Sequence, residues 1–239
     1  VAGGKLAAIL CVEGGHAIVD DLDILRMFHK RGARYMTLTH NMSNGWAAGI
    51  QDEAGKEAPT DWQKDRNKFI NSGWIKEQSK HKGLTTFGRE VVREMNRIGV
   101  IVDISHVARK TFWDVIETTT KPVIASHSSS FTICNNPRNI DDDQLKAVAK
   151  NNGVVCVNYE VTFVSNSCNL ATRKIDRWRD QKLEEIDREC SDNPEILKAA
   201  RDTVKKEHRK RSAPELKKPQ YTEIVDHIDH MVKVAGIDH

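Results

Sequence analysis

Three short apolar segments of this chain each end at a side chain that can bind a metal ion. The first ends at Glu13, the second at His106 and the third at His127. Short apolar runs bounded by turn residues are typical of buried strands in a parallel sheet. Because the carboxyl ends of parallel strands meet on one rim, these three side chains are expected to form a single metal site. Gly14 and Gly15 directly follow Glu13 and indicate a turn where backbone approaches a ligand closely.

Helical patterns separate these apolar segments along the chain. The predicted strands are residues 6–12, 35–39, 100–105, 122–126 and 153–159. The predicted helices are residues 20–30, a helix that ends at Asn96 after a Thr85 or Thr86 cap, residues 109–118 and residues 141–150. Alternation of strand and helix favours an α/β fold with a parallel sheet, and right-handed crossovers then give a barrel or an open sheet.

The composition limits the classes of protein that fit the chain. At 239 residues it is long enough for one sizeable domain, or for one domain with an insertion. A net charge of +3 is too small and too dispersed to indicate a nucleic-acid partner. No apolar run approaches the roughly 20 residues that span a bilayer. Cys11 and Cys156 fall inside predicted strands, so we expect both to be buried thiols.

Residues 171–219 differ in composition from the rest of the chain. They are dense in Lys, Arg, Glu and Asp, apolar residues recur among them at helical spacing, and Pro194 marks the start of a second helix. We therefore expect a charged helical hairpin, inserted into the domain, whose charged faces are solvated. A regulatory or oligomer contact is the alternative. A last amphipathic helix is predicted over residues 221–234, with Gly236 as its stop.

Residues 41–72 form a predicted loop rich in polar residues, glycine and tryptophan. A loop this long inside a domain is usually functional. Trp46, Trp62 and Trp74 could therefore line a substrate pocket, or they could pin the loop to the rest of the domain.

The residue types at the strand ends are those of zinc sites. Imidazole and carboxylate are the usual ligands where a metal keeps an open position for water, so His106 and His127 suit terminal ligands of one metal. A carboxylate such as Glu13 can also bridge two metals, which would clamp a hydroxide and lower its pKa for attack on a carbonyl. Three ligands are too few for two metals, so further ligands must come from elsewhere.

Two further side chains beyond strand ends could take part in the chemistry. His40 follows the second predicted strand and could donate to the oxyanion of a tetrahedral intermediate. Arg138 lies beyond the His127 strand and could hold a substrate carboxylate in a bidentate pair. Each has a simpler alternative: a histidine at a strand end is often a hydrogen-bonded structural residue, and an arginine is often a surface residue or a helix-cap partner.

The segment Asp226-His227-Ile228-Asp229-His230 looks like a compact metal cluster. It lies, however, on the last predicted helix, which precedes a strand and should sit in the outer layer, away from the rim. We therefore expect His227 and His230 to lie on a solvated helix face.

Six segments of the chain together resemble the membrane (renal) dipeptidase family of zinc metallopeptidases. They are residues 13–16, 38–40, 87–96, 103–106, 126–129 and 138–142. The resemblance extends over residues 1–165 and again from Tyr221 to the end. It implies no role for the charged segment between them.

The resemblance implies a (β/α)8 TIM-type barrel, of which this chain would hold five strands, with two zinc ions per complete active site. It implies hydrolysis of the amide bond of dipeptides, often with a D-residue at the C-terminal side, and hence a small-molecule substrate. Family members are often dimers and often exported, so a homodimer in the periplasm or anchored to a membrane is expected. A His-x-Asp pair and a late Asp proton shuttle would lie before Val1 and after His239, so residues 1–239 are expected to be one barrel domain, incomplete at both ends.

Residue roles follow from the matching motifs. Glu13 resembles the metal-bridging carboxylate, and His106 and His127 resemble the ligands of one zinc. His40 resembles the residue that polarises the scissile carbonyl, and Arg138 resembles the binder of the substrate's terminal carboxylate. Two other interpretations stay open, namely another metal-dependent amidohydrolase or lactonase on the same scaffold, and an inactive barrel fragment.

Overall fold

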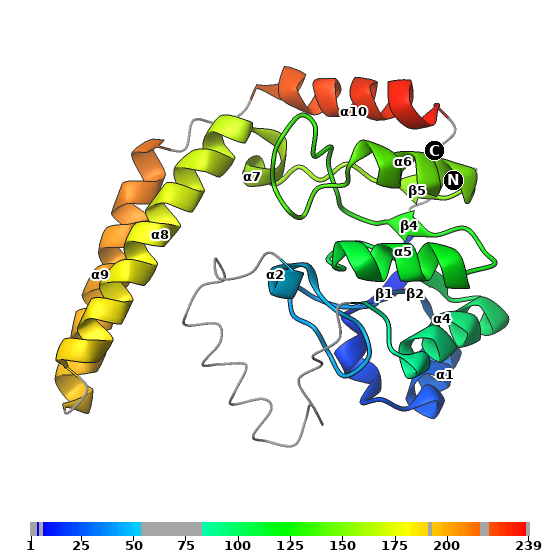
Figure 1. Ribbon diagram of the computed structural model, residues 1–239, viewed down its shortest axis with the longest axis horizontal. Coiled ribbons are helices and arrows are strands. Elements are labelled where there is room, and N and C mark those ends of the chain that lie inside the picture. Colours follow the sequence, from blue (N-terminus) through cyan, green and yellow to red (C-terminus); the bar gives the residue numbers. More distant parts are fainter. Residues whose placement is uncertain (1–3, 5–6, 54–82, 191–192, 216–219, 238–239) are drawn as a thin grey trace.

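The fold is built on a parallel sheet whose five strands follow one another in sequence order (Figure 1). The computed structural model describes residues 4, 7–53, 83–190, 193–215 and 220–237. The strands are β1 (Leu10–Glu13), β2 (Ala33–Thr37), β3 (Ile101–Asp103), β4 (Ile124–Ala125) and β5 (Val154–Val155). All four neighbouring pairs are parallel. The order never reverses, as it does in a doubly wound sheet, so every crossover steps the same way, as in a barrel.

Besides the single-turn helix α2 (Ile50–Glu53), which lies between β2 and β3, four helices connect the strands and cover one face of the sheet. They are α1 (Leu22–Lys30), α4 (Thr86–Ile98), α5 (Arg109–Thr118) and α6 (Asp142–Lys150). The side chain of Thr85 accepts a hydrogen bond from the Gly88 N–H and caps α4, and Asp141 caps α6 in the same way. The Thr85 cap was predicted from sequence, as was a helix that starts near Asp141. Leu25, Val92, Phe112 and Leu145 of these helices pack on strand residues such as Val102, in one buried apolar core.

The opposite face of the sheet is exposed within the described part of the chain. The strand register places Cys11, Tyr35 and Ile101 in one row on this face. Ile101 is 39% exposed and Val154 is 45% exposed. Cys11 and Cys156 are also exposed, so the prediction that they are buried thiols is wrong. The predicted α/β fold is confirmed, but the described strands form an open sheet in which the would-be barrel interior faces solvent.

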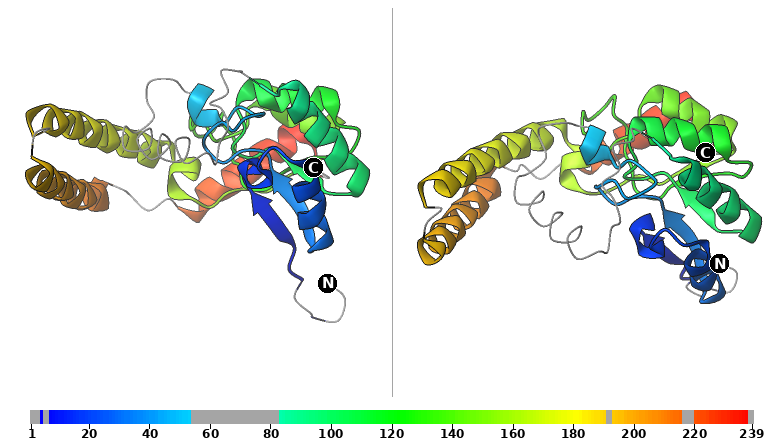
Figure 2. Two further views of the ribbon diagram at one scale, coloured as in Figure 1. Left: turned by 90° about the horizontal axis from the view of Figure 1, so that it is seen from below. Right: turned by 60° about the horizontal axis from the view of Figure 1, so that its bottom comes forward.

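The second half of the chain adds four helices beyond the sheet. They are α7 (Val161–Val164), α8 (Asn166–Glu189), α9 (Pro194–Glu215) and α10 (Tyr221–Ala235). Helix α10 packs beside α6, whereas α8 and α9 form a long hairpin that projects from the body in every view (Figures 1 and 2). None of the described helices combines the length and the apolar character needed to cross a membrane.

Both polar and apolar contacts join the two helices of the hairpin. Arg201 donates from two nitrogens to Asp187, and the guanidinium of Arg211 lies 3.9 Å from the ring centroid of Trp178. Leu183 and Val204 are buried between the helices. Helix α8 begins at Asn166, upstream of the charged segment, so its first turns lie beside α7 and the sheet rim rather than on the projecting arm.

Candidate metal centre

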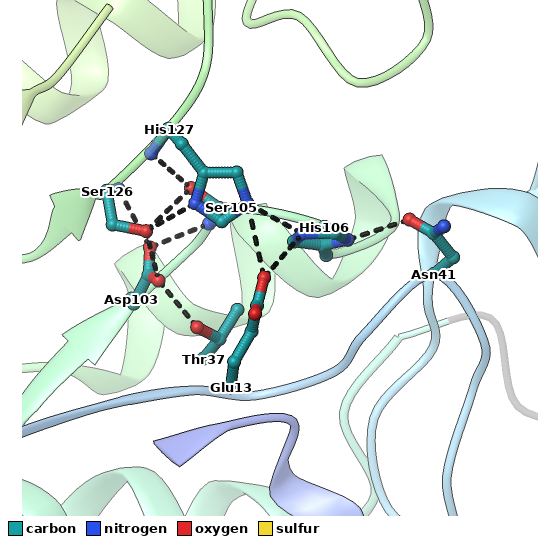
Figure 3. A network of polar contacts seen from close by, with 8 residues as sticks. All are labelled: Glu13, Thr37, Asn41, Asp103, Ser105, His106, Ser126 and His127. Atoms are coloured by element: carbon teal, nitrogen blue, oxygen red, sulfur yellow. Dashed lines mark hydrogen bonds and ion pairs between the residues drawn. The ribbon is translucent and has the colours of Figure 1, made fainter. Parts of the chain in front are cut away.

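The three side chains predicted to share a site do converge at one point on the rim of the sheet (Figure 3). Glu13 ends β1, while His106 and His127 follow β3 and β4. Glu13 Oε1 lies 3.2 Å from His106 Nε2 and 3.4 Å from His127 Nε2. The two Nε2 atoms are 2.7 Å apart. The three ligand atoms therefore lie close enough together to coordinate one metal ion.

Hydrogen bonds on the far side of each ring decide which nitrogen carries the proton. His106 Nδ1 lies 2.7 Å from Asn41 Oδ1, which can only accept, so Nδ1 is the protonated nitrogen. His127 Nδ1 lies 2.7 Å from Ser126 Oγ, whose own proton is donated to Asp103. Both imidazoles thus direct an Nε2 lone pair at the same point.

This arrangement fits a bound cation. Two lone pairs facing each other at such short range repel unless a positive charge lies between them. In a tetrahedral zinc site with bond lengths near 2.0–2.2 Å, neighbouring ligand atoms are about 3.3 Å apart, as the two distances from Glu13 are. The two Nε2 atoms, at 2.7 Å, are closer than this and would have to move apart to hold the ion. Two imidazoles and one carboxylate are also a donor set that leaves a fourth position open.

The local environment keeps both histidines neutral, as metal ligation requires. Burial lowers the pKa of His106 to about 2, and the nearby charge of Arg138 acts in the same direction. Burial and Arg138 also lower the pKa of His127, with Asp103 and Glu13 opposing them. The rings therefore offer lone pairs rather than protons at neutral pH.

Asp103 lies beside the metal ligands, and its hydrogen bonds organise the site (Figure 3). It is fully buried, and it accepts hydrogen bonds from Thr37 Oγ1 and Ser126 Oγ at 2.6 Å each. The backbone N–H groups of Ser105 and Ser126 also donate to it, at 3.0 Å each. Asp103 therefore ties together the ends of β2, β3 and β4 and fixes the hydroxyl that holds His127.

No role was predicted from the sequence for Asp103, Ser126 or Asn41. One signal was available, because an aspartate at the end of an otherwise apolar strand is rarely buried without several hydrogen-bond donors around it. The identity of those donors depends on contacts between separate strands.

His40 and Arg138 both lie next to the three ligands. The ring of His40 stacks on that of His106, with centroids 4.5 Å apart and an angle of 28° between the planes. The guanidinium of Arg138 lies 5.3 Å from the ring centroid of Phe163. Its Nη2 atom is buried and has no hydrogen-bond partner among the described residues. Burial lowers the pKa of Arg138 to about 10, so the group remains a cation with unused donors at neutral pH.

A cleft of about 460 Å³ joins these groups to the helical half of the chain. Glu13, His106, His127 and Arg138 line it on one side, and Phe163 of α7 with Asn169 and Arg177 of α8 line it on the other. A smaller hollow of about 190 Å³ also borders Arg138, with Ile104, Phe112 and Ile140 in its wall. The cleft is large enough for a small molecule to touch the metal ligands and Arg138 together.

Trp46 packs in the core rather than in the cleft. Its side chain is 1% exposed and meets Phe87 edge-on. A Cβ added at Gly15 would overlap the Trp46 indole and the Leu38 carbonyl oxygen. The close approach that leaves no room for a side chain at Gly15 is made by Trp46 and the Leu38 carbonyl, and Trp46 pins its loop. Trp62 and Trp74 lie outside the described residues.

The prediction that His227 and His230 are solvated is wrong. His227 is 0% exposed: its Nδ1 accepts from the Ser130 N–H at 2.9 Å, and its Nε2 lies 2.9 Å from the Val164 carbonyl oxygen. His230 Nε2 lies 2.8 Å from an oxygen of Asp142. Helix α10 packs this face inward against α6 and α7, so the histidines connect elements instead of facing solvent.

Comparisons with known proteins point to one family. The model of the family described as membrane dipeptidase (peptidase family M19) matches residues 1–239. A Rhodobacter sphaeroides metallo peptidase, solved with a phosphinate mimic of the dipeptide L-Ala-D-Ala, is 24% identical with a TM-score of 0.62, over 97% of this chain and 47% of its own.

Two solved structures from Pseudomonas aeruginosa are also similar. The probable dipeptidase PvdM is 22% identical with a TM-score of 0.68, over 99% of this chain and 56% of its own. An amidohydrolase is 28% identical with a TM-score of 0.52, over 66% of this chain and 40% of its own. The chain thus spans about half the length of the structures that it matches, and these likenesses support the barrel-type α/β fold.

Proposed function

Because this chain belongs to the membrane dipeptidase family, peptidase family M19, we propose that it is a metal-dependent dipeptidase acting at the rim of its sheet. One observation carries the proposal: two histidine lone pairs and a carboxylate converge beside Arg138, a buried cation with unused donors. A metal site next to a carboxylate clamp is what cleavage of a very short peptide requires.

We further propose that the metal is zinc, with two ions in a complete site. Glu13 would bridge them, and His106 and His127 would hold one of them. Bound zinc supplies Lewis-acid chemistry, since it polarises a carbonyl and lowers the pKa of water to near neutrality. The nitrogen and oxygen donors present suit this ion, and the neutral state of both imidazoles at pH 7 favours its binding.

The substrate is held by groups of this chain on either side of the scissile amide. Arg138 binds the free carboxylate of the C-terminal residue through its unused N–H groups, in a bidentate pair that fixes orientation. His40, stacked on His106, donates to the carbonyl oxygen as negative charge develops there. Arg138 lines the cleft of about 460 Å³ together with the metal ligands, and a site of this size suits a dipeptide better than a long chain.

The dipeptide accepted includes one with a D-residue at its C-terminal side. Support comes from the Rhodobacter sphaeroides structure, whose ligand mimics L-Ala-D-Ala. On family resemblance alone we also propose a homodimer, and a protein that is exported or attached to a membrane. An amidohydrolase or lactonase activity on the same scaffold is the competing function, and Arg138 is what favours the dipeptidase, because a lactone offers it no carboxylate.

The proposal is tested by metal analysis and hydrolysis on the purified protein. We expect bound zinc by elemental analysis, and release of free alanine from L-Ala-D-Ala and L-Ala-L-Ala that stops when a chelator is added. Bound zinc with cleavage of lactones or acyl amides, but not of dipeptides, would favour the competing function. A protein that binds no zinc and cleaves none of these substrates would be a non-catalytic member of the family.

A further inference from the structure

The loop that carries Arg138 lies between β4 and α6, and its shape is set by asparagine side chains. Asn139 Nδ2 donates to the carbonyl oxygens of Cys134 and Phe163 at 2.9 and 2.8 Å. Asn136 Oδ1 accepts from the Arg138 N–H at 2.9 Å, so Asn136 holds the backbone of Arg138 itself. The position of the guanidinium therefore depends on whatever fixes Asn136.

The first turn of α8 fixes this part of the loop from outside. Asn169 Nδ2 donates to the Asn135 carbonyl oxygen at 2.8 Å, and Asn169 Oδ1 accepts from Asn136 Nδ2 at 3.4 Å. Asn166 Oδ1 accepts from the Asn135 N–H at 3.2 Å. Both backbone polar groups of Asn135 are thus bound by one helix, next to the residue that holds Arg138.

Asn169 is well suited to act as an anchor. It is 2% exposed. A buried amide must satisfy both its N–H donors and its oxygen acceptor, so Asn169 holds the loop in one arrangement. The same helix-and-loop unit carries Phe163, whose carbonyl accepts from Asn139 and whose ring lies against Arg138. Arg138 is therefore clamped between a loop and a ring that are both tied to α7 and α8.

We propose that Asn169 is a positioning residue for Arg138, so that α8 forms part of the substrate site. The inference rests on the proposed dipeptidase function, in which Arg138 binds the substrate carboxylate. The role is indirect: Asn169 holds Asn135, it shares the hold on Asn136 with the Thr162 carbonyl oxygen of α7, and Asn136 holds Arg138. A carboxylate clamp works only when its guanidinium is held in the productive orientation by its supporting contacts.

Kinetics of Asn169→Ala against a dipeptide provide the test. We expect KM for L-Ala-D-Ala to rise by about tenfold with kcat changed less than about threefold, since supporting contacts typically contribute factors of this size. Lys174→Ala, an exposed change on the same helix, is the matched control and should behave as wild type. KM for the dipeptide amide, which lacks the carboxylate, should not respond to Asn169→Ala.

A double variant separates positioning from general destabilisation. In an Arg138→Ala background, Asn169→Ala should raise KM no further, because the two changes remove one interaction. Additive effects, or equal losses on the dipeptide and its amide, would overturn the proposal. If Asn169→Ala does not fold, Asn166→Ala should give a smaller rise of KM in the same direction, and no rise would count against the role.

Two measurements that do not depend on catalytic activity test this inference separately from the proposed function. If wild type cleaves no dipeptide, the function fails, but the anchoring can still be measured by amide hydrogen exchange over residues 134–140 and by modification of Arg138 with phenylglyoxal. Both should be faster in Asn169→Ala than in wild type or Lys174→Ala. Unchanged rates would show that α8 does not hold the loop.

Discussion

The Nε2 atoms of His106 and His127 face each other at 2.7 Å, each with its lone pair exposed because the opposite ring nitrogen is already a donor. Neutral imidazoles do not hold this geometry without a cation or a shared proton between them. Burial and Arg138 disfavour the proton, since they lower the pKa of both rings. The protein therefore holds the two imidazole rings in an arrangement that a bound metal ion would stabilise.

Changing Glu13 to glutamine should remove metal binding and leave the fold intact. Glu13→Gln keeps the shape of the side chain but removes the negative charge that compensates a cation. The Glu13 side chain is 48% exposed, so we expect the melting temperature without metal to shift by less than about 2 °C. Zinc content and dipeptide hydrolysis should both be lost. Turnover at the wild-type rate would exclude the bridging role.

Removing the Ser126 hydroxyl should weaken zinc binding, although Ser126 is not itself a metal ligand. Ser126→Ala frees His127 to rotate or to change tautomer, and loss of such a supporting contact typically costs about 10–100-fold in metal affinity. Ser126→Thr keeps the hydroxyl and is the matched control. Competition with a chromophoric chelator gives both affinities. Equal affinities in the two variants would mean that Asp103 and Ser126 do not orient His127.

The residues of the site that follow from local pattern were predictable, and those that depend on contacts between strands were not. An apolar run ending in Glu13 or His127 marks a strand end, and parallel strands bring their ends together whatever else the chain does. The Thr85 and Asp141 caps are equally local, because each acts within its own helix turn. By contrast, the groups that donate hydrogen bonds to Asp103 lie at the ends of three strands, and no sequence spacing indicates which residues they are.

The burial of single side chains was harder to predict because it depends on which elements pack together. Cys11 lies in a strand, but its face of the sheet is left open in the described structure. His227 lies on an amphipathic helix whose polar residues suggested solvent, yet α10 turns it toward Ser130 and Val164. An alternating pattern identifies two faces, and only the tertiary arrangement decides which of them is covered.

Replacing Arg138 should impair binding of dipeptides and spare substrates without a free carboxylate. Arg138→Ala removes charge-assisted hydrogen bonds, so we expect KM for L-Ala-D-Ala to rise by about 10–100-fold. KM for the corresponding dipeptide amide should change little. Arg93→Ala, an exposed arginine on α4, is the matched control. An unchanged KM for the dipeptide would exclude Arg138 as the carboxylate clamp.

The buried imidazole of His227 should make the fold less stable in acid. Burial lowers the pKa of His227 from the usual 6.5, and His230 acts in the same direction. The hydrogen bond to the Val164 carbonyl and the charges of Asp226 and Glu223 oppose this shift. Nδ1 must stay unprotonated to accept from the Ser130 N–H. The unfolded chain therefore binds this proton more readily than the folded chain. The stability is fully present above about pH 6.5 and is lost as the pH falls toward the lowered folded pKa.

Melting temperatures measured from about pH 7.5 to pH 5.5 with zinc present check this prediction. One such group contributes at most about 1.4 kcal/mol per pH unit, or about 3–6 °C in melting temperature for a chain of this size. His227→Gln keeps a donor and an acceptor without titrating, so its melting temperature should fall less on acidification than that of wild type. His29→Gln on α1 is the control and should keep the wild-type slope. If the His227→Gln slope matches wild type, the acid sensitivity belongs to other groups, since His16, His106 and His127 also have a lowered pKa.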